Sequence, residues 1–229
     1  MLSAEEKELV LSYLPLVRQI AYQVHRHLPP SVDVKDLIGY GILAVIEALP
    51  KLDRNKNPNA YLKLRIRGAM YDYLRSLDFA SRGIRSREKA IREAVDRLKM
   101  EKGEDFSDEE LAQFMGEDPE KLREDLQAIS FSYMLSLDEL FQEGRSYEEL
   151  FESKEEGPEE AVIKKDLRER LLKAIEKLDQ REKLVLQLLY YEELPLKEVS
   201  KLLGISMARV SQIKAQAIEK LKRYLTSAE

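Results

Sequence analysis

The chain has 229 residues, 44% of them hydrophobic and 35% charged, which is enough apolar material for packed cores and too much for a wholly disordered chain. It contains no cysteine, so disulfides, thiolate metal sites and a cysteine nucleophile are excluded. His25 and His27 are the only histidines, and their spacing of two shares a face only on a strand, so we expect no metal or other cofactor. No apolar run approaches about 18 residues, and the first residues are acidic where a signal peptide is basic. These features predict a soluble cytoplasmic protein.

Charge is distributed unevenly along the chain, although the net charge is only −5. Residues 61–99 carry +6 and residues 161–229 carry +5, while residues 100–160 between them carry −16. Attraction to phosphate is local and is screened beyond about 8 Å, so the two basic blocks matter more for nucleic-acid binding than the total does. The distribution therefore favours two basic modules separated by an acidic block.

Helical periodicity runs through nearly the whole sequence, with few Gly and Pro and abundant Leu, Glu and Lys. Capping boxes mark two helix starts, at Ser107 with Glu110 and at Asp179 with Glu182. The sequence predicts an all-α protein of three small helical domains joined by linkers, the last containing a helix-turn-helix. The expected division is 1–85, then 86–130 with three short helices, then an acidic connector over 131–160, helical only in part, and finally 161–229.

The clearest local motif is the helix-turn-helix, in LKEVSKLLGISMARVSQIKAQAIEKLKRY at 196–224. Gly204 suits the tight turn, and five apolar positions are spaced to form the core between the two helices. These positions are Val199, Leu203, Ile205, Val210 and Ile213.

The second helix of this motif is predicted to begin at Ser206 and to direct six side chains outward to DNA. These are Met207, Ala208, Arg209, Ser211, Gln212 and Lys214. Gln212 suits bidentate pairing with adenine, while Arg209 and Lys214 suit guanine or phosphate. The alternative is an ordinary helical hairpin whose charges are merely solvated.

Just upstream, REKLVLQLLYYEEL places apolar residues almost all round a helix, from Leu184 to Tyr191. Such a helix is either buried in a core or partly covered by a partner, and the sequence leaves both open.

A second basic segment lies at 59–93, where arginines alternate with aromatic residues, among them Tyr61, Tyr71, Tyr73 and Phe79. Basic groups follow phosphates, and aromatic faces stack on unpaired bases. The alternative is a core helix whose aromatics pack inward. Tyr71 and Tyr73 cannot both face a core, because positions i and i+2 diverge on a helix, so we expect one of them to be exposed.

The order of these parts resembles a bacterial RNA polymerase sigma factor of the sigma-70 superfamily. The helix that binds core polymerase is resembled by DLIGYGILAVIEALPKLD, and the helix that melts and reads the −10 element by YLKLRIRGAMYDYLRS. The start of the acidic connector is resembled by LSLDE. The helix-turn-helix resembles the module that reads the −35 element. RIRGAMYDYLRSLDF, LDQREKLVLQLLYYEEL and RVSQIKAQAIEKL are similar to the flagellar, or motility, alternative sigma factors.

The resemblance implies a transcription initiation factor for flagellar genes. The segments 1–85, 86–130 and 161–229 would correspond to sigma regions 2, 3 and 4, and strand opening would accompany −10 recognition. The implied −10 and extended −10 residues are Tyr61, Arg65, Arg67, Tyr71, Arg75, Arg82 and Arg85. The implied polymerase-binding residues are Asp36, Tyr40, Ile42, Leu43, Ile46 and Glu47.

The resemblance also implies the partners. The 36–52 helix would dock on the clamp helices of the largest core polymerase subunit, and the third module would dock on the flap of the second large subunit. The connector would enter the active-site channel, and a small anti-sigma factor would hold the free protein. One departure is clear: the tandem Trp pair of primary sigma factors reads here as Leu64 and Arg65, so its strand-opening role does not transfer.

Two other classes of protein fit the sequence less well. An enzyme is disfavoured because no Walker loop, HExxH, Gly-x-Ser-x-Gly or GxGxxG occurs. A free-standing helix-turn-helix regulator would bind a palindrome unaided as a dimer, whereas this sequence has two unlike basic modules. Binding to promoter DNA without polymerase separates these classes, and we expect that binding to be weak because the acidic connector competes with phosphate.

Overall fold

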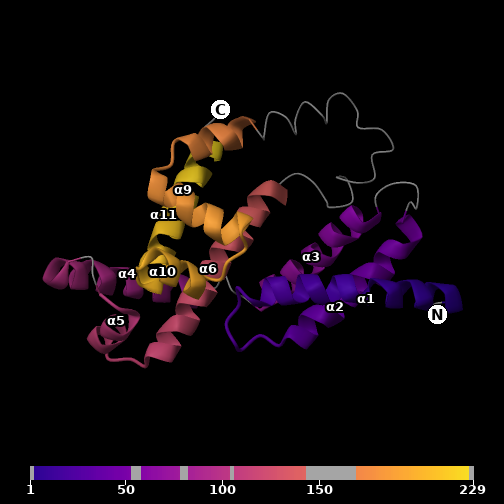
Figure 1. The fold of residues 1–229 in the computed structure, drawn as a ribbon, viewed down its shortest axis with the longest axis horizontal. Coiled ribbons are helices and arrows are strands. Elements are labelled where there is room, and N and C mark those ends of the chain that lie inside the picture. Colours follow the sequence, from indigo (N-terminus) through magenta and orange to yellow (C-terminus); the bar gives the residue numbers. More distant parts are fainter. Residues whose placement is uncertain (1–2, 53–57, 78–81, 104–105, 143–168, 227–229) are drawn as a thin grey trace. The chain divides into compact units, whose positions relative to one another are not determined.

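The computed structural model describes residues 3–52, 58–77, 82–103, 106–142 and 169–226. Every regular element in these ranges is a helix, as predicted. The described residues fall into two compact units, 3–77 and 82–226 (Figure 1).

The first unit consists of α1 (Ala4–His25), α2 (Val34–Ala48), the short 3₁₀ helix η1 (Leu49–Lys51) and α3 (Pro58–Ser76). Ser3 and Glu6 form a capping box at the start of α1, and Asp33 caps α2. The core contains Val17, Leu37 and Ile66, one from each long helix. Gly41 allows these helices to approach closely, because a Cβ there would lie 2.7 Å from both Met70 Cε and Val17 Cγ1.

The second unit begins with α4 (Arg82–Lys102), α5 (Asp108–Met115) and α6 (Pro119–Gln142). The predicted capping box of Ser107 and Glu110 is present, and α5 ends at Gly116 in the left-handed conformation. Three helices were expected here, but two of them are long. The expected boundary at 130 falls inside α6, where Phe131 and Leu135 are buried. Residues 131–142 are therefore helix rather than linker, and the remainder of the predicted connector, 143–160, lies outside the described residues.

The same unit continues with a helical stretch over 169–176, α9 (Gln180–Leu186), the π-helical turn η2 (Gln187–Tyr191), α10 (Leu196–Leu203) and α11 (Met207–Thr226). One core contains Val95, Leu111 and Leu126 together with Val185 and Val210. The predicted second and third modules thus share a core instead of being separate bodies, because α11 packs along α6 and touches α4 (Figure 1).

The apolar segment at 184–191 has features of both alternatives that its sequence left open, a buried core helix and a surface for a partner. Val185, Leu188 and Leu189 are buried in the shared core. Leu184 and Tyr191 are exposed, Tyr191 by 81%. An apolar surface therefore remains on the outer side of this segment.

Candidate nucleic-acid interface

The helix-turn-helix forms as predicted. Gly204 ends α10 in the left-handed conformation, with φ of 65°, and the Ser206 hydroxyl accepts a hydrogen bond from the Arg209 amide at 3.3 Å. Val199 and Val210 are completely buried between the helices. Local sequence is sufficient here, because the turn residue and the apolar spacing both act within about 20 residues.

The expected outward face of α11 is covered in this structure. Met207, Ala208, Ser211 and Lys214 are buried, and only Arg209 and Gln212 remain half-buried. The expectation of six exposed side chains was wrong for this conformation, because α4, α5 and α6 pack against the face that would meet DNA.

Asp108, on α5, contacts the beginning of α11. Its two carboxylate oxygens accept hydrogen bonds from the backbone amides of Met207, at 3.0 Å, and Ala208, at 3.1 Å. Burial raises the pKa of Asp108, while the two amide bonds act in the opposite direction. A carboxylate here satisfies amides that have no partner within the helix.

Lys214 lies about two turns further along α11 and is 2% exposed. Its Nζ donates to the Ser130 carbonyl oxygen at 2.7 Å and lies 2.9 Å from Ser130 Oγ, on α6. The Nζ also lies 5.1 Å from the centre of the Tyr190 ring. Burial lowers the pKa of Lys214 to about 7.

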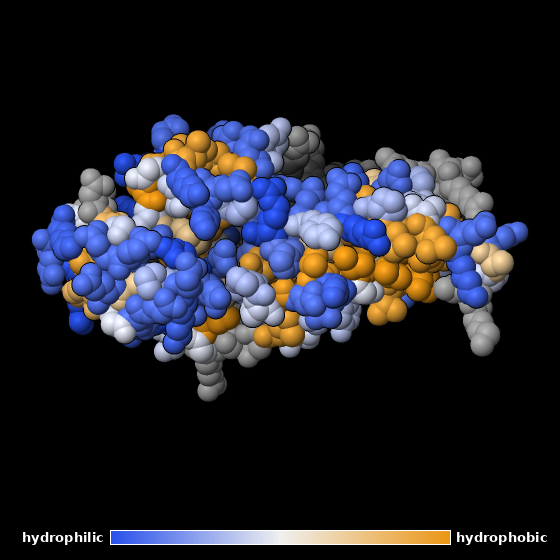
Figure 2. All heavy atoms as spheres, turned by 60° about the horizontal axis from the view of Figure 1, so that its bottom comes forward, coloured by the Kyte–Doolittle hydropathy of each residue, from blue (hydrophilic) through white to orange (hydrophobic). Residues whose placement is uncertain are grey.

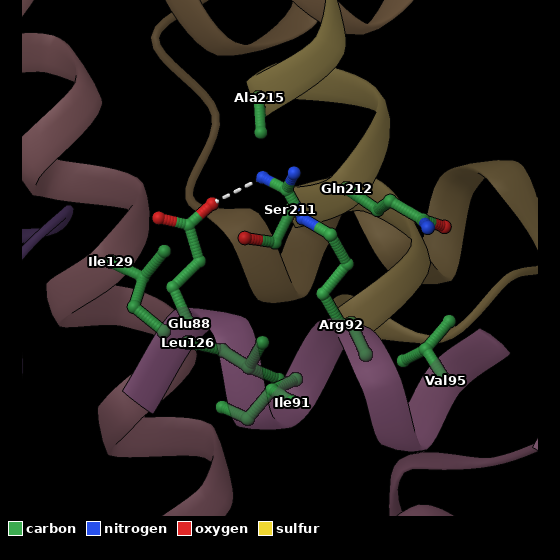
Figure 3. Close-up of a pocket in the computed structure, with 10 residues that line it drawn as sticks. Glu88, Ile91, Arg92, Val95, Leu126, Ile129, Ser211, Gln212 and Ala215 are labelled. Atoms are coloured by element: carbon green, nitrogen blue, oxygen red, sulfur yellow. Dashed lines mark hydrogen bonds and ion pairs between the residues drawn. The ribbon is translucent and has the colours of Figure 1, made fainter. Parts of the chain in front are cut away.

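Polar side chains border the contact between α4 and α11 (Figure 3). Glu88 pairs with Arg92 at 2.8 Å, and Arg92 lies 3.6 Å from Glu219 of α11. Gln212 donates to Asp96 at 3.4 Å and accepts from Arg209 at 2.5 Å. Two of the polar residues expected to contact DNA, Arg209 and Gln212, thus bond each other, and Gln212 also bonds α4.

A small cavity of about 30 Å³ remains beneath these polar groups, and Figure 3 shows Ile91, Leu126 and Ile129 on its apolar side. The contact between α4 and α11 is therefore closely packed.

The basic helix of the first unit, α3, is only partly available to a ligand. Tyr71 is buried, so its expected contact with DNA is wrong in this conformation, while Tyr61, Arg65, Arg67 and Arg75 are half-buried. Arg75 pairs with Asp72 at 2.5 Å, and Arg65 lies 4.0 Å from Glu47.

Tyr73 is not among the expected site residues, yet it links α3 to α2. Its ring stacks on Tyr40 with 4.3 Å between centroids, and its hydroxyl donates to Asp36 at 3.1 Å. The prediction that Tyr71 and Tyr73 cannot both be core is confirmed, since Tyr71 is buried and Tyr73 is half-buried.

Two further arginines were expected at the −10 end of the site, at the start of α4. Arg85 is exposed, while the side chain of Arg82 lies outside the described residues, as does Phe79. Arg87, which belongs to the same basic stretch, instead binds Asp125 at 2.7 Å and Glu117 in a bidentate pair. It therefore fastens α4 to α6.

The six residues expected to bind polymerase lie on α2. Asp36, Tyr40, Leu43 and Glu47 are exposed and recur at helical spacing along one face, and Ile42 and Ile46 flank them half-buried. Leu43 is 53% exposed. Figure 2 shows apolar side chains gathered over the part of the first unit that contains α1 and α2. This face has the apolar centre and charged edge of a protein interface.

No metal-binding cluster of acidic or histidine side chains occurs among the described residues, and His25 instead bonds the Val32 carbonyl oxygen at 2.8 Å. Within the same ranges, no helix is long and apolar enough to cross a membrane.

Three family models match the chain in order: sigma-70 region 2 over residues 9–79, sigma-70 region 3 over 87–162 and sigma-70 region 4 over 174–223. The RNA polymerase sigma factor FliA of Yersinia enterocolitica is 36% identical over 219 residues, which is 94% of this chain and 95% of that protein. The RNA polymerase sigma-D factor of Bacillus subtilis is 33% identical and covers 95% of this chain and 88% of its own.

A solved structure of the flagellar sigma/anti-sigma complex Sigma-28/FlgM matches with a TM-score of 0.86 at 50% sequence identity, covering 97% of this chain and 96% of that one. Three sigma regions on an all-helical chain define a transcription initiation factor. The chain belongs to the sigma-70 family of RNA polymerase sigma factors, in the flagellar, sigma-28 type.

Proposed function

We propose that the chain binds core RNA polymerase through α2 and directs it to promoters of flagellar genes, with α3 and the start of α4 reading the −10 element and α11 the −35 element. The observation that carries this proposal is the ordered match of regions 2, 3 and 4 together with the exposed face of α2. The catalytic step belongs to the polymerase.

The partners follow from the same surfaces. The α2 face would meet the clamp helices of the largest polymerase subunit, and the outer side of the 184–191 segment, with Leu184 and Tyr191 exposed, would meet the flap of the second large subunit. A small anti-sigma factor would bind the free protein, as FlgM binds Sigma-28 in the solved complex of that relative. Residues 143–160 lie outside the described ranges, and their passage into the active-site channel rests on the resemblance alone.

The test is run-off transcription with core polymerase on flagellar promoter templates, with mapping of the start sites. We expect transcripts only when this protein is added. Core-independent, tight binding to a palindromic duplex would contradict the proposal and favour a free-standing regulator.

A matched pair of variants tests the docking face. Leu43→Glu places a charge on the α2 face, whereas Leu11→Glu places one on α1, at a leucine that is 60% exposed. We expect Leu43→Glu to weaken core binding by at least tenfold and Leu11→Glu to leave it unchanged, with both variants folded by circular dichroism. Equal core affinity of the two variants would remove α2 from the interface.

A further inference from the structure

A side chain of α3 holds part of the α2 face that is expected to bind polymerase. The ring of Tyr73 stacks on Tyr40, with 4.3 Å between the ring centroids and 18° between the ring planes. The Tyr73 hydroxyl donates to Asp36 Oδ2 at 3.1 Å. Asp36 and Tyr40 are exposed, while Tyr73 is half-buried. One residue of α3 therefore holds two of the six expected docking residues.

The close approach of α2 and α3 brings these side chains together. Gly41 lies where the two helices touch, because a Cβ there would be 2.7 Å from Met70 Cε and 3.3 Å from Ile66 Cγ2, both on α3. Successive positions on a helix are turned by about 100°, so Tyr40 lies at the edge of this contact and not within it. The ring of Tyr40 therefore meets Tyr73 at the border between the helix contact and the exposed face.

The chemistry of the contact suits a surface that is ordered before its partner arrives. Asp36 lies in the first turn of α2, where the positive end of the helix dipole favours a negative charge, and a hydrogen bond to a carboxylate is stronger than one between neutral groups. Partial burial and the hydrogen bond to Asp36 raise the pKa of Tyr73, so its hydroxyl remains a donor at neutral pH. Side chains that are already held lose less freedom when a partner binds.

The packing of α2 on α3 does not by itself require this contact. Leu37 of α2 and Ile66 and Leu74 of α3 are completely buried and supply the core between the helices. The partners of Tyr73 are exposed, so its ring and hydroxyl order the surface of the unit and not its interior. Tyrosine is also a residue that often dominates the energetics of protein interfaces.

We propose that Tyr73 is a positioning residue of the polymerase-docking face, which holds Asp36 and Tyr40 from α3 in the orientation that the polymerase binds. The inference rests on the proposed function, because it takes α2 as the docking helix. Tyr73 acts through its two neighbours and makes no polymerase contact of its own. The helix that carries the candidate −10 residues thus also shapes the surface for the protein partner.

The first experiment measures affinity for core polymerase by competition with a fluorescent parent chain. The chain has no cysteine, so Met100→Cys, at an exposed position of α4, accepts the fluorophore. Tyr73→Phe removes only the hydroxyl and should weaken core binding about fivefold, because fewer chains then have Asp36 in the binding orientation. Tyr73→Leu also removes the stack and should weaken binding about twentyfold. Parental affinity of Tyr73→Leu would overturn the inference.

The matched control is Tyr22→Phe, which makes the same change at a tyrosine of α1 that is 57% exposed. We expect its core affinity to equal that of the parent. A loss equal to that of Tyr73→Phe would show that removing any surface hydroxyl of this unit weakens binding, and the positioning role would be wrong.

A double-mutant cycle separates positioning from direct contact. Asp36→Ala should weaken core binding, and adding Tyr73→Phe should then change it by less than about twofold, because the hydroxyl has no carboxylate left to hold. Additive losses would overturn positioning through Asp36. Parental affinity of both Asp36→Ala and Leu43→Glu would contradict the proposed docking role of α2 and the inference with it. Losses in those two variants beside parental binding of both Tyr73 variants would overturn the inference alone.

Folding and transcription measurements exclude two other roles for Tyr73. Chemical denaturation should show that both Tyr73 variants are fully folded under the assay conditions. Run-off transcription should return to the parental level when Tyr73→Phe is added at saturating concentration, because docking is impaired and promoter reading is not. A partly unfolded Tyr73→Phe would assign the residue a structural role, and a lowered plateau would assign it a role on DNA. Either result would overturn the inference.

Discussion

Lys214 meets two opposed requirements. Its position on α11 suits contact with phosphate as a cation, but in the closed unit, in which α4, α5 and α6 pack against α11, its Nζ is buried between Ser130 and the ring of Tyr190. Burial penalises the charged form and lowers the pKa of this amine to about 7 from 10.5. The closed arrangement therefore binds fewer protons than the open one between these two values.

Closure is expected to depend on pH through this residue. Because the open form binds more protons between about pH 7 and 10.5, the closed form gains stability as pH rises through that window and loses it as pH falls, by up to about tenfold per pH unit. Below about pH 7 the dependence on Lys214 levels off. Ser130 and Tyr190 face the amine from α6 and η2. Among the described residues, two buried carboxylates also contact α11: Asp108 at its first amides, and Glu182, which accepts a hydrogen bond from Lys220.

Distances between spin labels at Met100→Cys on α4 and Leu202→Cys on α10, both exposed positions, check this expectation when measured at pH 7 and pH 9. Lys214→Met should flatten the pH dependence, while Lys102→Ala, which removes an ion pair with Glu110 away from α11, should retain it. A parent whose open fraction is the same at both values would show that Lys214 stays charged in the closed unit.

Gln212 is expected to read one base once the helix is open. Gln212→Ala should cost about 1–3 kcal/mol at a single upstream position and relax the preference there, because a bidentate contact with adenine is lost. The measurement is selection of a randomised −35 library by the assembled polymerase. Gln216→Ala, at an exposed position one turn further along α11, is the matched control and should keep the parental preference. Unchanged preference in both variants would exclude Gln212 from base reading.

Elements in this protein begin and end where short-range chemistry requires. The capping boxes at Ser107 and Asp179 and the left-handed Gly204 were all predictable, because each acts within one helical turn. The end of α6 was not predictable, since the polar and acidic composition after residue 130 suggested a linker while Phe131 and Leu135 are buried by another helix. The π-helical turn at 187–191 likewise had no local signal.

Two glycines of α2 allow a direct test of helix packing. A Cβ at Gly41 would lie 2.7 Å from Met70 Cε and Val17 Cγ1, whereas nothing lies within 4 Å of a Cβ at Gly39. Gly41→Ala should destabilise the first unit by about 1–3 kcal/mol through overpacking. Gly39→Ala should stabilise it by about 0.5–1 kcal/mol, because alanine favours the helix. Chemical denaturation measures both variants, and equal effects would contradict the close approach of these helices.

At the scale of the whole molecule, weak DNA binding by the free chain has two competing explanations. The sequence suggested that the −16 block at 100–160 competes with phosphate. The structure shows that packing covers α11, through α4, α5 and α6. Asp108, from that acidic block, does compete for α11, but as one placed carboxylate rather than as diffuse charge.

The two explanations predict different effects of substitutions on the DNA affinity of the free protein. Replacing five acidic residues of the connector by Gln should leave DNA affinity of the free protein near the parental value, because α11 stays buried, while Asp108→Ala raises it. These five are Glu148, Glu149, Glu152, Glu155 and Glu156. Fluorescence anisotropy at several salt concentrations distinguishes the two explanations. A large gain in DNA affinity for the Gln variant at low salt would favour masking by the connector.

The sequence by itself determined the all-helical class and the helix-turn-helix, because periodicity and caps act locally along the chain, and the order of its motifs identified the family. It did not reveal that the second and third modules share one core, that Tyr71 is buried or that α11 turns its reading face inward. The inward face of α11 depends on pairs such as Asp108 with Met207, 99 residues apart, and Ser130 with Lys214, 84 residues apart. Only tertiary structure decides them, because an amphipathic helix with a basic face fits a core or a DNA groove equally well until its neighbours are placed.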